Sequence, residues 1–358
     1  MLQFVGRRLV LAIPVMLGII ILVFVLARVI PGDPCIATYG EKATPELCAA
    51  FNARYGLNEP IWTQFLIYLG ALLQGDLGTS IRFGRPVSDI IVERLPMTIE
   101  LTIVALLFAS VVGITLGLIS AIRRNSPVDV GTMIVANLGV STPVFVLGLI
   151  LQIIFAVWLK DTFLTLPPSG RLTAGTDVIP IAVAWGLEGL QGPLRAILDF
   201  LSNLYVLNAV LTLNWPLFVD ATSHLILPAA AVGTIPLAII ARMTRSSLLE
   251  VLGLDYIRTA RAKGLRERFV VLRHGMRNAM LPVVTVIGLS VAGFLSGAIL
   301  TETIFNLAGV GRTLFEAIQG RDYAVVQGVT IVVAVGYVMV NLLVDVSYAY
   351  LDPRIRLS

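Results

Sequence analysis

The sequence predicts an all-α membrane protein with six transmembrane helices, two long loops on one side and a basic loop between the fourth and fifth helices. Three observations support this fold class. The chain of 358 residues is 57% hydrophobic and only 13% charged, so a soluble domain of this length would leave too much apolar surface in water. Its apolar residues gather in long runs. Its Lys and Arg residues gather in short segments between some of those runs.

Six apolar runs are long enough to cross a hydrocarbon core of about 30 Å, which takes roughly 20 helical residues. They lie near residues 9–29, 98–121, 131–158, 224–245, 279–302 and 323–350. The first run is too long for the core of a signal peptide, and no small-residue cleavage pattern follows it. We therefore expect it to be a retained helix.

The positions of Lys and Arg predict that both termini are cytoplasmic. Fifteen of the 26 Lys and Arg residues lie in four short segments: the two ends of the chain, the loop after the second run and the loop between the fourth and fifth runs. Nine of these fifteen lie in the last of these loops, between Arg242 and Arg277. The other two loops, near 30–97 and 159–223, are long, and the first holds five basic and seven acidic residues. Because positive charge in short loops stays on the cytoplasmic side, the long loops are expected to be extracytoplasmic. This rule accounts for the sequence pI of about 9.2 without any nucleic acid partner.

The first long loop contains an apolar helical pattern and both cysteines of the chain. The pattern lies at residues 58–78 and predicts an amphipathic helix on the membrane surface or, alternatively, a short helix buried in an outer subdomain. Cys35 and Cys48 could form a disulfide that stabilises the fold by about 2–4 kcal/mol, or they could remain free thiols. No metal site is expected, because His224 and His274 lie far apart in the sequence.

The chain lacks the motifs of an ATPase or another enzyme. It has no glycine-rich phosphate-binding loop ending in Lys and no H-E-x-x-H or G-x-S-x-G motif. Acidic residues within the runs lie near their ends: Asp345 near the cytoplasmic end, Glu100 and Glu302 near the outer ends. Because proton-coupled carriers need ionisable groups near mid-membrane, energy should come from a partner protein, unless the chain is a passive pore.

The basic loop, residues 246–284, begins with a predicted amphipathic helix. Leu249, Leu252, Tyr256 and Ala260 fall on one stripe of it, and the arginines at 258 and 261 lie off that stripe. Gly264 is placed to end the helix, since glycine readily adopts the left-handed conformation found there. Thr259 and Ala260 are small and would allow another backbone to approach.

A second basic helix is expected to follow, before the chain re-enters the membrane. Asn278 occupies the predicted N-cap of the fifth span and Pro282 its first turn. The ordered helix–glycine–helix pattern favours docking of another protein. A polybasic patch for anionic lipid is the alternative, and a nucleic acid site is disfavoured for a loop held against a membrane.

Several small and polar residues in the runs could pack helices together or line a pathway. Gly113 and Gly117, like Gly293 and Gly297 with Ser296 beside them, have the spacing of close helix contacts. The polar candidates are Asn137, Gln152, Gln327 and Asn341. Three prolines, Pro143, Pro228 and Pro236, interrupt the runs and predict kinks.

The basic loop also resembles a known family. Its DYIRTARAKGL and LRHGMRNAMLPVVT segments are similar to the coupling loop of ABC importer permeases of the dipeptide, oligopeptide and nickel transporter group. RVIPGDP, ERLPMTIELT, STPVFVLGLILQ, LPPSGR, GVGRTLFEAIQGRDYAVVQG and LDPRIR extend the resemblance along nearly the whole chain, to the dipeptide permease B-type subunit. One departure from the general importer loop is Arg258, which stands where that loop has glutamate.

The resemblance implies a non-catalytic permease subunit of an ATP-driven importer that carries di- or oligopeptides into the cytoplasm. The implied partners are a homologous second permease, two cytoplasmic subunits that bind ATP and Mg, and an extracytoplasmic peptide-binding protein; the chain itself needs no cofactor. The residues implied to contact an ATPase subunit are Asp255, Tyr256, Ile257, Arg258, Thr259, Ala260, Arg261, Ala262, Lys263 and Gly264.

The same resemblance implies a location and a division of the chain. The location is the bacterial inner membrane, with both termini cytoplasmic. The predicted parts are residues 1–97 (first span and outer loop), 98–351 (a core of five spans with the coupling loop 246–277) and 352–358 (the cytoplasmic tail). Two alternatives stay open: nickel chelates or glutathione carried by the same machinery, and a passive channel or secondary carrier with a lipid-binding basic loop.

Overall fold

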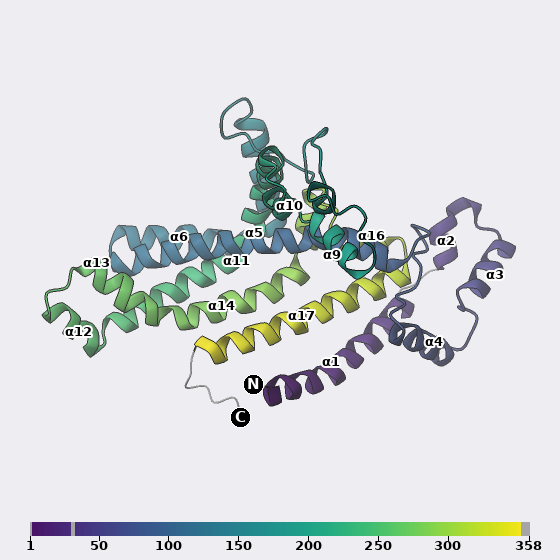
Figure 1. Ribbon diagram of the computed structural model, residues 1–358, viewed down its shortest axis with the longest axis horizontal. Helices are drawn as coiled ribbons and strands as arrows, with labels where there is room; N and C mark the ends of the chain where they lie inside the picture. The colour runs from purple at the N-terminus through teal and green to yellow at the C-terminus, as the bar shows by residue number, and fades with distance from the viewer. Residues whose placement is uncertain (1, 30–32, 352–358) are drawn as a thin grey trace. The chain divides into compact units, whose positions relative to one another are not determined.

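The computed structural model describes residues 2–29 and 33–351, which form helices joined by loops (Figure 1). One isolated antiparallel bridge, between Thr79 and Pro86, is the only strand-like pairing in these residues. The all-α prediction is therefore confirmed for the described part of the chain. The tail 352–358 and part of the RVIPGDP segment lie outside it.

The described residues fall into two compact units. The first comprises residues from 1–98 and 308–338, and the second those from 99–307 and 339–358. The first unit contains α1 (Leu2–Val29), α2 (Pro34–Tyr39), the 3₁₀ turn Gly40–Lys42, α3 (Pro45–Arg54), α4 (Ile61–Leu73) and α16 (Val310–Gln319). Two helices, α5 (Val87–Ile122) and α17 (Tyr323–Leu351), have residues in both units.

The second unit holds the remaining helices. They are α6 (Pro127–Ser141), α7 (Val144–Gln152), the π-helix Ile153–Trp158, α8 (Ile181–Ala184), α9 (Pro193–Ser202), α10 (Tyr205–Leu211), α11 (Trp215–Leu252), α12 (Asp255–Ala262), α13 (Glu267–Phe269), the π-helix Val270–Gly275, α14 (Met276–Gly297) and α15 (Ile299–Ile304).

Four to six stretches of the described residues have the length and composition to cross a membrane. Four are single helices, at Gly6–Leu26, Val87–Ile122, Trp215–Leu252 and Tyr323–Val344. Two more are helix pairs bent by 105°, Pro127–Ser141 with Val144–Trp158 and Pro193–Ser202 with Tyr205–Leu211. Five of these six match predicted spans, the first bent pair matching 131–158. The second bent pair lies in the predicted loop 159–223, and α14, at the predicted span 279–302, is not among the six.

The bend between α6 and α7 occurs at Pro143. The residue before it, Thr142, has an extended backbone (φ −95°, ψ 125°), because the proline ring disfavours the helical conformation for its predecessor. The kink predicted at Pro143 is thus confirmed. Pro228 and Pro236 instead lie inside the single helix α11.

The first unit is held together by a small aliphatic cluster and a buried acid. Val87, Ile90 and Ile91 of α5 pack against buried side chains of α16 and α17. Asp322, 1% exposed, accepts hydrogen bonds from the Ser80 hydroxyl and the Arg82 backbone N–H. These bonds hold the loop before α5 against the start of α17.

Candidate functional site

The basic loop is a compact helical hairpin that joins α11 to α14. Helix α11 ends at Leu252, and α12 begins three residues later. Gly264, just after α12, has φ +74°, in the left-handed region that a side chain would strain. The predicted role of Gly264 in ending this helix is therefore confirmed.

Two details of the predicted loop were wrong. The stripe of Leu249, Leu252, Tyr256 and Ala260 is not one continuous helix face, because the chain turns between α11 and α12. Asn278 does not cap a helix: the π-helix Val270–Gly275 runs directly into α14, so Asn278 lies in a continuous helical segment. The structure uses its side chain differently, since Asn278 Nδ2 donates to the Tyr256 hydroxyl at 2.6 Å.

The inner face of α12 packs on the rest of the loop. Ile257 (0% exposed) and Ala260 (7% exposed) contact the buried Val270 and the partly buried Leu252. Ala260, expected on the sequence to let another backbone approach, is therefore covered by its own loop. Asp255, Arg258 and Thr259 lie on the exposed face instead.

Charge pairs shape the surface of the loop. The Arg261 guanidinium donates to both carboxylate oxygens of Glu267, at 3.0 and 2.7 Å. This contact lowers the pKa of Glu267. Arg258 and Asp255 form a more exposed pair at 3.2 Å. Since exposed pairs contribute little to stability, these two pairs do little to hold the loop together.

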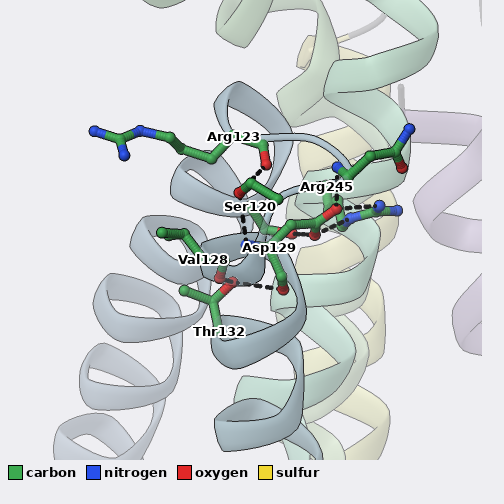
Figure 2. A network of polar contacts seen from close by, with 8 residues as sticks. Ser120, Arg123, Val128, Asp129, Thr132 and Arg245 are labelled. Atoms are coloured by element: carbon green, nitrogen blue, oxygen red, sulfur yellow. Dashed lines mark hydrogen bonds and ion pairs between the residues drawn. The ribbon is translucent and has the colours of Figure 1, made fainter.

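A polar network lies at the turn between α5 and α6, with its arginine on α11 (Figure 2). Asp129 is 4% exposed, and its two oxygens accept from Arg245 Nε and Nη2, both at 2.8 Å. The Ser120 hydroxyl and the Asn125 backbone N–H complete its partners. The network therefore fixes the α5–α6 turn to α11, three turns before α12 begins.

This network was not predicted from the sequence, in which Arg245 is only one of the nine basic residues between Arg242 and Arg277. The structure places Arg245 inside α11 and pairs it with a buried acid. One local signal was available: Ser126 before Pro127, with an acid three residues after the serine, is typical of a helix start. The Ser126 hydroxyl does accept from the Asp129 N–H, but this pattern names no partner on a distant helix.

The first predicted glycine pair is a site of close helix packing. A Cβ at Gly113 would lie 2.8 Å from the carbonyl oxygen of Leu237, and one at Gly117 would lie 2.5 Å from that of Ala241. Helices α5 and α11 thus approach backbone to backbone, which only glycine allows. Of the two roles left open for this pair, the structure supports packing.

The other predicted packing and pathway residues are scattered. Gly293 has nothing near its Cβ position and lines an apolar pocket of about 430 Å³ with Val232 and Pro236 of α11 and Leu289 of α14. Asn137 lies beside the Asp129 network in a second pocket. Gln327 is buried in the first unit with its side-chain amide N unpartnered, and Asn341 is half-buried. The surroundings of Ser296 and Gly297 lie outside what the structure describes.

The segment 159–223 is anchored to α5 by an ion pair. Arg171, from the LPPSGR segment, donates to Glu100 at 3.2 Å and stacks over the ring of Tyr205 at 3.8 Å. The second oxygen of Glu100 accepts from the Val206 N–H at 2.6 Å. Glu100, noted from sequence as an acid near a span end, therefore positions the loop. Gln152 makes a similar tie, donating to the carbonyl of Pro168 at 2.7 Å.

In the segment 33–54, Cys35 and Cys48 are joined by a disulfide with a Cα–Cα distance of 5.5 Å. The bridge ties α2 to α3. Within residues 2–29 and 33–351, no cluster of three or more His, Cys, Asp or Glu side chains could hold a metal ion.

Two family models together match almost the whole chain. Residues 113–357 match the binding-protein-dependent transport system inner membrane component, and residues 1–102 match the N-terminal part of such membrane components.

Curated relatives are similar over their full length. The dipeptide transport system permease protein of Escherichia coli (strain K12) is 46% identical over 357 residues, 99% of each chain. That of Alkalihalophilus pseudofirmus is 44% identical over 356 residues, 99% of this chain and 100% of the relative. The oligopeptide transport system permease protein of Bacillus subtilis (strain 168) is 37% identical over 357 residues, with the same coverage.

Proposed function

The chain belongs to the family of binding-protein-dependent transport system inner membrane components, and from this membership we propose that it is the permease subunit of an ATP-driven importer of di- or oligopeptides. It is a multi-pass inner membrane protein and does not itself hydrolyse ATP. The relatives that cover the chain from end to end are dipeptide and oligopeptide permeases, which supports peptides over nickel chelates or glutathione as cargo.

In this proposal, α12 docks on a cytoplasmic ATPase subunit. The observation that supports docking is that the two faces of α12 differ in burial. One face is buried on its own loop through Ile257 and Ala260, and the other exposes Asp255, Arg258 and Thr259. Arginine beside a small residue suits contact with a carboxylate-bearing partner. The exposed residues between Asp255 and Gly264 thus form a short helical surface.

Movement of α12 would pass to the membrane helices through fixed contacts. Tyr256 receives the hydrogen bond from Asn278 at the start of α14, and α12 follows α11 after two residues. Nucleotide binding on one side and a loaded binding protein on the other would bias two arrangements of these helices. The Asp129–Arg245 network would make α6 follow α11 in that movement.

The proposed topology has six spans, with both termini and α12 on the cytoplasmic side. The long segments 30–97 and 159–223 would then face the extracytoplasmic binding protein, and a homologous permease would complete the membrane part. The charge bias of the short segments supports this orientation. The apolar pocket beside Gly293 and the side chain of Asn137 are candidates for the pathway.

A substitution on the exposed face of α12 tests the docking role. Thr259→Trp adds bulk where no described residue covers the helix, so the chain should insert normally but lose its ATPase subunits and its peptide uptake. Arg124→Trp is the control, because Arg124 is an exposed residue of the α5–α6 turn, outside α12.

Two readouts are needed: co-purification of partner subunits with the tagged chain in mild detergent, and uptake of a labelled dipeptide by cells. Normal uptake by the Thr259→Trp variant would refute docking through this face. If the control variant also loses its partners, the effect is not specific to α12.

A further inference from the structure

Helix α4 has one face packed on α1 and one apolar face left uncovered. The packed face carries Phe65 and Tyr68, whose rings lie 5.1 and 5.7 Å from the ring of Phe24. The uncovered face carries Trp62, Leu66, Ile67 and Leu73, which are 51% to 81% exposed. Helix α4 contains no charged residue. At 13 residues, about 20 Å, it is too short to cross a bilayer.

The depth of α4 follows from its contacts with α1. Between Arg8 and Arg28, α1 has 19 residues without charge, Leu9 to Ala27, or about 28 Å at 1.5 Å per residue, which matches the hydrocarbon core. Phe24 lies near the C-terminal end of this run, and Arg28 follows the run directly. Arg28 Nε donates to Gln64 of α4 at 2.8 Å. These contacts hold α4 at the boundary between acyl chains and headgroups.

The side chains at this level suit that boundary. Trp62 is on the uncovered face, and tryptophan is enriched where acyl chains meet headgroups. The guanidinium of Arg28 lies 3.5 Å from the centre of the Phe24 ring and donates to Gln64 and to the Phe24 carbonyl. Its three other N–H groups have no acceptor among the residues that the structure describes, so they can bind a lipid phosphate.

We propose that α4 is an interfacial helix whose uncovered face is occupied by lipid of one leaflet, with Arg28 at the level of the phosphates. Helix α1 also exposes apolar side chains close in sequence to Phe24, since Leu22, Val25 and Leu26 are 45% to 58% exposed. Lipid covers such a surface without needing polar partners, whereas a water-exposed protein partner would meet four large apolar side chains and no charge. The inference requires α1 to span the membrane but not that the cargo is a peptide.

The test measures whether lipid reaches position 66. An environment-sensitive fluorescent amino acid replaces Leu66 in the intact importer, which is reconstituted into vesicles of phosphatidylethanolamine and phosphatidylglycerol. Some of the lipids carry a spin-label quencher, near the headgroup in one preparation and at the acyl chain end in another. The control position is Glu46, an exposed residue in the first turn of α3.

We expect fluorescence at position 66 to be lost mainly with the shallow quencher, and fluorescence at position 46 to be lost only with aqueous iodide. Loss of fluorescence at position 66 with iodide but not with lipid quenchers would overturn the proposal, because water would then cover α4. Protection of position 66 from iodide and from the lipid quenchers would also overturn the proposal, since another subunit would then cover the face. Should the reporter at position 66 prevent assembly, the same reporter in place of Trp62 gives the same readout.

Discussion

The approach of α5 to α11 at Gly117 predicts that a single methyl group destabilises the protein. A Cβ at position 117 would lie 2.5 Å from the Ala241 carbonyl oxygen and 2.6 Å from the Thr244 Cβ. Both distances are almost 1 Å shorter than an ordinary contact, and one of the opposing atoms is backbone, which moves only if the helices separate. In Gly117→Ala, the two helices must therefore move apart.

The size of the effect is the balance of two terms. Overpacking of this kind costs about 3 kcal/mol at the upper end of its range, whereas replacing a helical glycine by alanine contributes about 1 kcal/mol. The net loss for Gly117→Ala is then about 2 kcal/mol. Gly113→Ala should cost less, since its closest backbone contact is 2.8 Å.

A matched control is available on α6. Gly131 is also a helical glycine, but nothing lies within 4 Å of its Cβ position. In Gly131→Ala, only the gain in helix propensity remains, so stability should stay unchanged or rise by up to about 1 kcal/mol.

The assay is the thermal midpoint of the purified complex, measured as the monodisperse fraction that survives heating in mild detergent. The expected order of midpoints is Gly131→Ala at or above the parent, then Gly113→Ala, then Gly117→Ala, lower than the parent by several degrees. If Gly117→Ala and Gly131→Ala change the midpoint in the same direction, the contact between the α5 and α11 backbones does not have the tightness that we infer.

Two further predictions concern the ion pair and the disulfide. Asp129→Asn should lower the thermal midpoint more than Asp199→Asn. Asp129 is buried among four hydrogen-bond donors, and the amide of asparagine would turn its own N–H groups toward them, whereas Asp199 forms only a half-exposed pair with Arg195. Equal midpoints for the two variants would argue against a structural role for the network. When the chain is unfolded without a reductant, a thiol reagent should modify neither Cys35 nor Cys48. Labelling of both cysteines under this condition would refute the bridge.

Parts of the fold were predictable because they depend on local composition. A run such as Gly6–Leu26 has too much apolar surface for water, so its helical crossing follows from the sequence. Gly264 was also predictable, since its left-handed conformation is a property of a single residue at a helix end. The break at Pro143 follows from ring sterics in the same way.

The candidate site was less predictable because its contacts join distant residues. Asp129 and Arg245 are 116 positions apart, and no local pattern pairs them. Ala260 is small and lies next to exposed residues, so only the fold of the loop over Val270 reveals that it is buried. The helix pattern of α4 names no partner on another helix, and only the structure reveals its contacts with Phe24 and Arg28 of α1.

The sequence by itself determined the class of the protein, the approximate spans, the helix–glycine–helix pattern of the basic loop and the family. These depend on hydrophobicity, backbone preference and motif, which are carried by neighbouring residues. The tertiary structure alone decided which face of α12 is exposed, which glycines touch a helix backbone and which acid holds α6 to α11. Those outcomes depend on the distance between atoms far apart in the chain, and packing sets that distance.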